Sequence, residues 1–231
     1  MKHVHSKGSI ETHPRYEDYE IERMCIEELQ KSNLLPDEPA PIRIDRFIEK
    51  RFELTPDYLD LKPGLLGFTK FGSFGAEAIV ISRALGEDNT IVSKRRVRTT
   101  LAHEAGHALL HSSLFDDPKR RMQELFDQEH EDLSKVLCRD VVGSVDVERR
   151  RYDGSWWEFQ ANRAMGSLLL PETLFRKAAI PFLTSAGFLD IGPATISPEG
   201  KRELECSLSD LFDVNPIVVR FRLHQLYPST R

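Results

Sequence analysis

Residues 100–111 read TLAHEAGHALLH and contain the pattern His103-Glu104-x-x-His107. Positions four apart lie on one face of an α-helix, so both imidazoles can reach the same metal ion. Imidazole nitrogen is a good zinc ligand, and two such rings leave room for a third protein ligand and a water molecule. Glu104 follows the first histidine, which predicts that its carboxylate takes a proton from that water. The stretch therefore predicts a helix that carries a catalytic zinc site.

The alternative is that this short pattern occurs by chance on a solvated helix. Gly106 argues against that alternative, because a glycine inside a helix costs about 1 kcal/mol relative to alanine and so predicts a close neighbour. The residues around the motif are mostly apolar, which indicates a buried helix: Leu101, Ala102, Ala105, Ala108 and Leu109. Buried histidines and a buried carboxylate need partners, and a metal ion would supply one.

The third ligand must come from another part of the chain. His111 lies two turns after His103, about 12 Å along a straight helix, and is predicted to be a residue of the helix end rather than a ligand. Glu158 is the better candidate because it lies in WWEFQANRAMGSLLLP, residues 156–171, an otherwise apolar helical pattern. Asn162, one turn later, predicts an orienting hydrogen bond. The alternative for Glu158 is an acidic residue that simply favours the helix start.

Composition and charge limit the possible classes of protein. The 231 residues are 40% hydrophobic and 30% charged, which is typical of a folded domain, and the net charge of -5 gives no general attraction to nucleic acid. Three well-separated cysteines predict reduced thiols in a cytoplasmic protein. No apolar run approaches the roughly 20 residues of a membrane span, and the polar N-terminus does not resemble a secretory signal.

The N-terminal part, residues 1–40, is predicted to contain a frayed terminus, a helix over 16–33 and a proline-rich linker. A shorter helix is expected around Ile44–Phe52. Residues 64–85 predict two strands joined as a hairpin at the glycine-rich turn GSFG.

The motif helix follows this hairpin. Residues 113–154 are dense in charge and are predicted to form surface helix fragments and loops. A strong helical pattern then runs over 155–170, and two short helical segments end the chain. The domain prediction is a catalytic domain over 41–175, with 113–154 as a charged insertion, and a C-terminal helical subdomain over 176–231.

The two motifs together resemble the ImmA/IrrE family of metallopeptidases. The residues that carry the resemblance are His103-Glu104-Ala105-Gly106-His107 and Trp157-Glu158-Phe159-Gln160-Ala161-Asn162, followed by Ala164, Leu168, Leu169 and Pro171. The resemblance covers roughly residues 40 to 175. It implies an α+β, zincin-like fold with a small antiparallel or mixed sheet and one zinc ion. It also implies that His103, His107 and Glu158 are the ligands and that Glu104 is the catalytic acid and base.

The resemblance further implies a protein substrate, since members of the family act on transcriptional repressors. In zincins the substrate backbone usually pairs with a sheet edge beside the active-site helix, and Glu77 to Leu85 is our candidate for that edge or its neighbour. Glu158 lies 51 positions (158 minus 107) after His107, more than we expect in compact members of the family. The inserted segment 113–154 is either a lid or specificity lobe beside the cleft or a neutral surface elaboration.

Two hypotheses of other classes remain open. Residues 208–227, LSDLFDVNPIVVRFRLHQLY, resemble a helix-turn-helix and suggest a DNA-binding regulator with a structural zinc. Its recognition helix would carry Arg220, Arg222, His224 and Gln225. Residues 201–231 hold five Lys/Arg against four Asp/Glu, so a plain helical hairpin is favoured, and a structural zinc would be expected to have four protein ligands. The other hypothesis is an inactive relative that binds a partner, against which the intact Glu104 argues.

Overall fold

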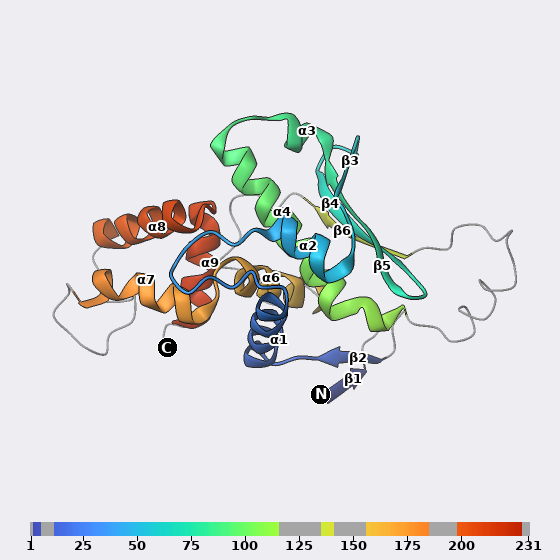
Figure 1. Ribbon diagram of the computed structural model, residues 1–231, viewed down its shortest axis with the longest axis horizontal. Helices are drawn as coiled ribbons and strands as arrows, with labels where there is room; N and C mark the ends of the chain where they lie inside the picture. The colour runs from blue at the N-terminus through green and yellow to red at the C-terminus, as the bar shows by residue number, and fades with distance from the viewer. Residues whose placement is uncertain (1, 6–11, 116–134, 141–155, 185–197, 228–231) are drawn as a thin grey trace, which may run out of the picture.

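The computed structural model describes residues 2–5, 12–115, 135–140, 156–184 and 198–227 and shows a mixed α+β fold (Figure 1). Its helices are α1 Asp18–Lys31, α2 Ile44–Phe52, α3 Arg83–Glu87, α4 Ile91–His111, the 3-10 turn η1 Ser112–Leu114, α6 Trp156–Leu169, α7 Glu172–Thr184, α8 Pro198–Phe212 and α9 Pro216–Leu226. Its strands are β1 Lys2–His5, β2 Thr12–Arg15, β3 Asp57–Leu59, β4 Leu65–Gly72, β5 Gly75–Ser82 and β6 Lys135–Asp140. The α+β class and the helices expected over 16–33, around 44–52 and over 155–170 are confirmed. Within the described residues no helix is long and apolar enough to cross a membrane.

The main sheet has the strand order β3-β5-β4-β6. Strands β4 and β5 form the predicted hairpin, with Gly75 at a positive φ of 119° in the turn. Strand β3 is parallel to β5, and β6 is antiparallel to β4. The prediction that Glu77 to Leu85 supplies a sheet edge is wrong for residues 80–82, because β5 there lies between β3 and β4 and pairs with β3. Strand β5 is the neighbour of β4, whose Thr69 bonds to Glu104 of α4.

Four strands arise where the sequence predicts none, namely β1, β2, β3 and β6. Strand β6, residues 135–140, lies inside the charged segment 113–154, where helix fragments and loops were predicted. At the N-terminus β1 and β2 pair as an antiparallel ribbon, whereas the sequence predicts a frayed end. Both pairings depend on contacts between separate segments, and local periodicity does not report such contacts. Residues 116–134 and 141–155 of the charged segment lie outside the described part of the chain.

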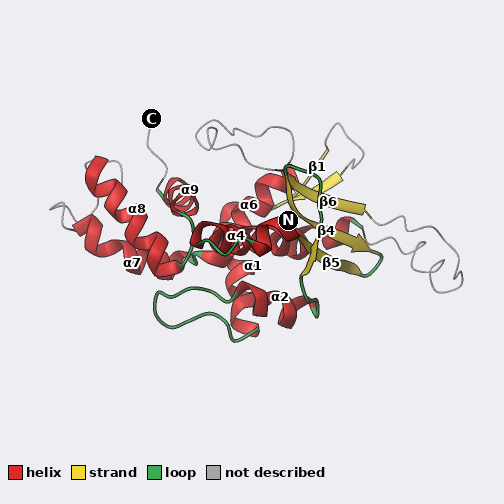
Figure 2. Cartoon of the chain, turned by 90° about the horizontal axis from the view of Figure 1, so that it is seen from above, coloured by secondary structure: helices red, strands yellow, loops and turns green. Residues whose placement is uncertain are grey.

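Helix α4 runs through the centre of the molecule, between the sheet and α6 (Figures 1 and 2). A Cβ atom added at Gly106 would lie 3.0 Å from the backbone oxygen of Ala161 and 3.0 Å from the Cβ of Ala164, both on α6. The two helices therefore approach each other closely at this glycine, which confirms the close neighbour that the sequence predicts. This approach brings the fifth turn of α4 against the second and third turns of α6.

One hydrophobic core crosses the domain boundaries predicted at residues 40 and 175. Buried residues from α1, α2, α4, α6, α7, α8 and α9 belong to it, and they include Ile21, Phe47, Ala105, Phe175 and Leu223. A buried ion pair ties the two ends of the described chain together, because Arg222 of α9 donates to the Glu22 carboxylate of α1 at 2.5 Å. The boundary at 175 falls inside α7.

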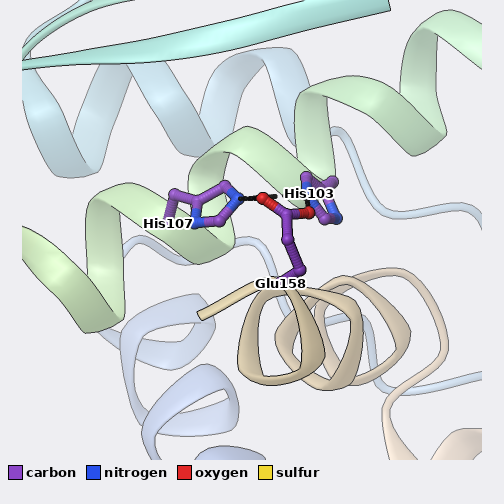
Figure 3. A group of neighbouring side chains, drawn as sticks. All are labelled: His103, His107 and Glu158. Atoms are coloured by element: carbon purple, nitrogen blue, oxygen red, sulfur yellow. Dashed lines mark hydrogen bonds and ion pairs between the residues drawn. The ribbon is translucent and has the colours of Figure 1, made fainter. Parts of the chain in front are cut away.

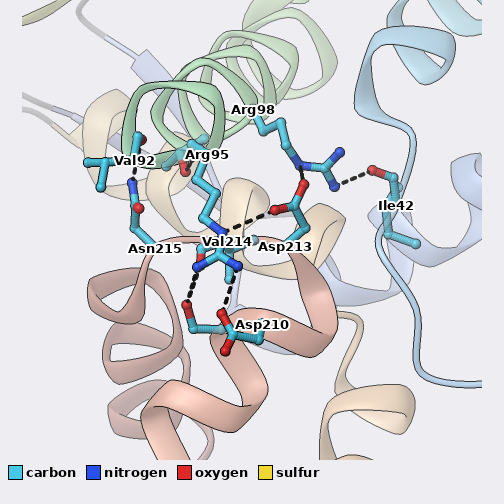
Figure 4. Close-up of polar contacts among 10 residues, drawn as sticks. Ile42, Val92, Arg95, Arg98, Asp210, Asp213, Val214 and Asn215 are labelled. Carbon is cyan, nitrogen blue, oxygen red and sulfur yellow. Dashed lines mark hydrogen bonds and ion pairs between the residues drawn. The ribbon is translucent and has the colours of Figure 1, made fainter. Parts of the chain in front are cut away.

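The turn between α8 and α9 is fastened to the N-terminal half of α4 (Figure 4). Arg95 donates to Asp213 at 3.0 Å and to Asp210 at 2.8 Å, and its remaining nitrogen donates to the Ser209 hydroxyl at 3.1 Å. Asn215 adds a bond to the carbonyl oxygen of Val92 at 3.3 Å. The end of α8 and α9, where the sequence suggests a helix-turn-helix, are thus joined by a turn that is bonded to α4, the helix of His103 and His107.

Candidate metal centre

The three predicted ligands converge on one point between α4 and α6 (Figure 3). The Nε2 atom of His103 lies 3.0 Å from one carboxylate oxygen of Glu158, and the Nε2 atom of His107 lies 3.2 Å from the other. The two Nε2 atoms are 3.1 Å apart. Both histidines are buried, and all three ligand atoms lie within 4.8 Å of one another. Among the described residues this group could hold a metal ion.

The arrangement fits a zinc ion in donor type and in spacing. Zinc takes nitrogen and carboxylate ligands at about 2.0–2.2 Å, and a tetrahedral arrangement then separates neighbouring ligand atoms by about 3.3 Å. The spacings of 3.0, 3.1 and 3.2 Å between the atoms of His103, His107 and Glu158 are close to that value. Three protein ligands leave a fourth position open, which is typical of catalytic rather than structural zinc.

Asn162 sets the tautomer of His103. Its side-chain oxygen lies 3.1 Å from the Nδ1 atom of His103, and an amide oxygen can only accept. Nδ1 of His103 therefore carries the proton, and its Nε2 lone pair faces the ligand point. The sequence predicts an orienting role for Asn162 beside Glu158; in the structure its hydrogen bond orients His103, the ligand from the other helix.

A second chain of hydrogen bonds sets the tautomer of His107. The side-chain oxygen of Gln160 lies 3.2 Å from Nε2 of His111, so His111 donates there and keeps an unprotonated Nδ1. That Nδ1 lies 3.0 Å from Nδ1 of His107, which therefore donates to it. Nε2 of His107 is left without a proton. Both ligand histidines thus direct a lone pair at the same point, where the Glu158 carboxylate also lies, and a cation satisfies all three.

His111 is confirmed as the last residue of α4 and does not join the ligand group. It is fully buried, and its ring meets the Trp156 ring edge-on at 5.4 Å between centroids. Burial lowers the pKa of His111 well below its usual value. His111 is therefore held neutral, the form that can both donate to Gln160 and accept from His107.

Glu158 is held as a carboxylate. Burial alone would raise its pKa, but the two histidines that face it, His103 and His107, favour the ionised form when they take up a proton, and the pKa of Glu158 is lowered overall. A ligand carboxyl must be ionised to bind a metal ion, so this environment favours the binding form. The alternative was that Glu158 is a solvated acidic residue at a helix start. The structure argues against it, because the Glu158 side chain faces two buried histidines.

Glu104 lies on the side of α4 that faces the sheet. It is fully buried, and the hydroxyl of Thr69 on β4 lies 2.8 Å from its carboxylate and 3.0 Å from its backbone oxygen. The two interactions join the strand to the helix next to the first ligand. Thr69 thereby fixes the side chain that the motif designates as the proton acceptor.

The sequence motifs located His103, His107 and Glu158 and the orienting residue Asn162, but not the other residues that position the group. Thr69, His111 and Gln160 were not assigned a role in the site. Gln160 lies two residues after Glu158 on α6, and its role follows only from how α4 and α6 are packed. No motif around Thr69 marks it, since its function depends on the register of β4 against α4.

Comparisons with protein-family models, with curated proteins and with solved structures give no match to this chain. The resemblance in the two motifs therefore stays a prediction, and the geometry of the site is the structural observation that bears on function.

Proposed function

We propose that the chain is a zinc-dependent metallopeptidase with a zincin-like catalytic domain, which hydrolyses a peptide bond in a protein substrate. The observation that carries the proposal is the convergence of two imidazole nitrogens and one carboxylate oxygen within 4.8 Å, with the buried Glu104 directly after the first of the two histidines in the chain. The ligand types and the open fourth position are those of catalytic zinc sites. The proposed complement is one zinc ion per chain.

A bound zinc ion would supply Lewis acidity and lower the pKa of a water molecule to about 7. Glu104 would accept the proton of the attacking water and then deliver it to the leaving amine. Thr69 keeps the Glu104 carboxylate in one orientation through its 2.8 Å hydrogen bond. Asn162 and His111 keep the ligand rings in the tautomers that bind.

The substrate class rests on the sequence resemblance, which favours a transcriptional repressor cleaved in the cytoplasm. The cysteine chemistry agrees with a reducing compartment, because Cys25 and Cys206 are free thiols. Burial raises the pKa of the Cys25 thiol, so this group is a neutral part of the core rather than a nucleophile.

The DNA-binding alternative has less support from the contacts of α9. Arg222, one of the four side chains of its supposed recognition helix, is buried against Glu22. Arg220 is bound by Glu205 of α8 at 2.7 Å. A recognition helix presents such groups to base edges and phosphates, and these two arginines are already paired within the chain.

The proposal is tested with Glu104→Gln in zinc-loaded protein and fluorescein-labelled casein as a general probe. Glutamine can still accept the Thr69 hydrogen bond but cannot take up a proton, so we expect zinc to be retained and casein hydrolysis to be lost. Glu203→Gln on the exposed face of α8 is the matched control and should leave both unchanged. Equal hydrolysis by wild type and Glu104→Gln would exclude this mechanism, and zinc binding without hydrolysis by wild type would favour the non-cleaving, partner-binding relative.

A further inference from the structure

Strand β6 covers the free edge of β4. Six residues of the charged segment, Lys135–Asp140, run antiparallel to β4, with Lys70 opposite Val136 and Thr69 opposite Leu137. Without β6, β4 would be an edge strand, since its other side is paired with β5. The chain thus supplies its own partner for this edge from a segment that lies between the two halves of the metal site in sequence.

The covered edge is the one beside the metal centre. Thr69, at the middle of β4, bonds to Glu104, so β4 is the strand that adjoins the proposed proton acceptor. Seen from above, β6 lies on the side of β4 toward α6, which carries Glu158, and β5 lies on the side toward α2 (Figure 2). The opposite sheet edge, β3, is separated from β4 by β5.

An uncovered strand edge is a template for an extended peptide, whose backbone hydrogen bonds give affinity. A protein substrate that presents its scissile bond to this site would therefore add to β4 as an extended strand. Strand β6 occupies that position already, with the backbone of this chain in place of the substrate.

We propose that β6 is an autoinhibitory strand, which pairs with the β4 edge in the resting protein and must leave it before a substrate segment can bind there. The inference rests on the proposed peptidase function and adds the regulation of its site. Because β6 belongs to the same chain, it competes at an effective concentration that a separate substrate does not easily match. Its sequence KVLCRD carries three charged residues in six, which is typical of a strand at the edge of a sheet.

A reversible crosslink tests whether β6 must move. Lys70→Cys with Val136→Cys joins directly opposed residues of β4 and β6 and leaves Thr69 and the ligands in place. The background carries Cys138→Ser and Cys206→Ser. We expect the oxidised protein to keep its zinc but to lose casein hydrolysis by about tenfold or more, and the reduced protein to recover it. Full activity in the oxidised form would overturn the proposal.

Removal of β6 tests whether activity rises when the β4 edge is left uncovered. Replacing residues 135–140 with a Gly/Ser sequence of equal length should raise kcat/KM on casein by about tenfold or more, mainly through a lower KM. The same replacement at residues 144–149 is the matched control. A folded, zinc-loaded strand variant that is less active than wild type would show that β6 is part of the working site and contradict autoinhibition. If this variant does not fold, the crosslink decides.

A binding measurement separates this inference from the peptidase proposal. In the Glu104→Gln background, a labelled peptide of residues 134–141 with Cys138→Ser should bind the strand-replaced protein and not the intact one, as measured by fluorescence anisotropy. This pattern without casein hydrolysis by any variant supports the strand pairing and refutes the peptidase. Hydrolysis by wild type with no peptide binding to the strand-replaced protein supports the peptidase and refutes the strand proposal.

Discussion

The Nδ1 atoms of His107 and His111 lie 3.0 Å apart on successive turns of α4. Only one of them can carry the proton, and the bond from His111 to Gln160 assigns it to His107. A residue that cannot reach the ligand point therefore determines which nitrogen of His107 is available there. The hydrogen bond on the far nitrogen of a ligand histidine usually affects metal affinity strongly.

We therefore predict that His111→Ala weakens zinc binding by about 10–100-fold, because His107 then loses the acceptor that fixes its tautomer. The dissociation constant is measured by competition with a chromophoric chelator at pH 7.5. His224→Ala removes an exposed histidine from α9 and should leave the constant unchanged. Identical zinc affinity in wild type and His111→Ala would show that His111 does not influence metal binding by His107.

The buried position of His111 also predicts how the metal-free protein responds to pH. Its lowered pKa means that the folded chain binds this proton less readily than the unfolded chain, whose histidines titrate near 6.5. The free energy of unfolding is then constant above about pH 6.5 for this group and falls below it, by up to about 1.4 kcal/mol per pH unit.

The measurement is urea unfolding of metal-free protein between pH 5 and 7. Glu158, whose pKa is lowered, loses its contribution only as the pH falls below about 4.3, so it does not interfere in this window. His111→Ala should show a shallower loss of stability than wild type, while His224→Ala follows wild type. Parallel curves for wild type and His111→Ala would contradict the prediction.

Thr69 is predicted to act on catalysis through Glu104. Thr69→Val keeps the shape of the side chain but removes the hydroxyl that bonds to the carboxylate at 2.8 Å. We expect kcat on casein to fall by about tenfold, a part of the roughly 10²–10⁴-fold that general acid–base catalysis contributes, with KM and zinc content unchanged. Thr69→Ser restores the donor and should recover most of kcat. A rise in KM alone would indicate a role in substrate binding instead.

The buried pair of Glu22 on α1 and Arg222 on α9 is predicted to stabilise the fold. Glu22→Ala would leave a fully buried guanidinium without its carboxylate, at a cost of about 3–5 kcal/mol in the free energy of unfolding. The double variant Glu22→Leu/Arg222→Met should recover much of that loss, because both charges are gone. In contrast, Glu27→Ala removes a partner from an exposed pair with Arg23 and should cost less than about 1 kcal/mol. Additive effects of the two buried substitutions in urea unfolding would refute the coupling.

Local sequence patterns predicted the elements whose determinants are close together in the chain. The histidines of the motif are one turn apart, so helical periodicity alone places them on one face, and Gly106 correctly indicated a close helix contact. Glu158 and Asn162 were found because polar side chains are conspicuous in an apolar helix. All of these depend on spacings of four residues or fewer.

The features that were missed depend on contacts between distant segments. Strand β6 is short and charged, and only its pairing with β4 makes it a strand. The hairpin of β4 and β5 was predicted, but the strand order was not, so the pairing of β3 with β5 was missed. The link from Gln160 to His111 joins residues 49 positions apart and requires the packing of α6 on α4.

The most direct test of the zinc centre is the metal content per chain, measured by elemental analysis on wild type and His103→Ala after exposure to zinc and gel filtration. His103 contributes one of three ligand atoms, so its removal should abolish stable binding. The account predicts about one zinc per wild-type chain and little in the variant. Wild-type protein that remains metal-free after zinc is added would contradict it, and the histidine motif would then be a feature of a buried helix without a metal.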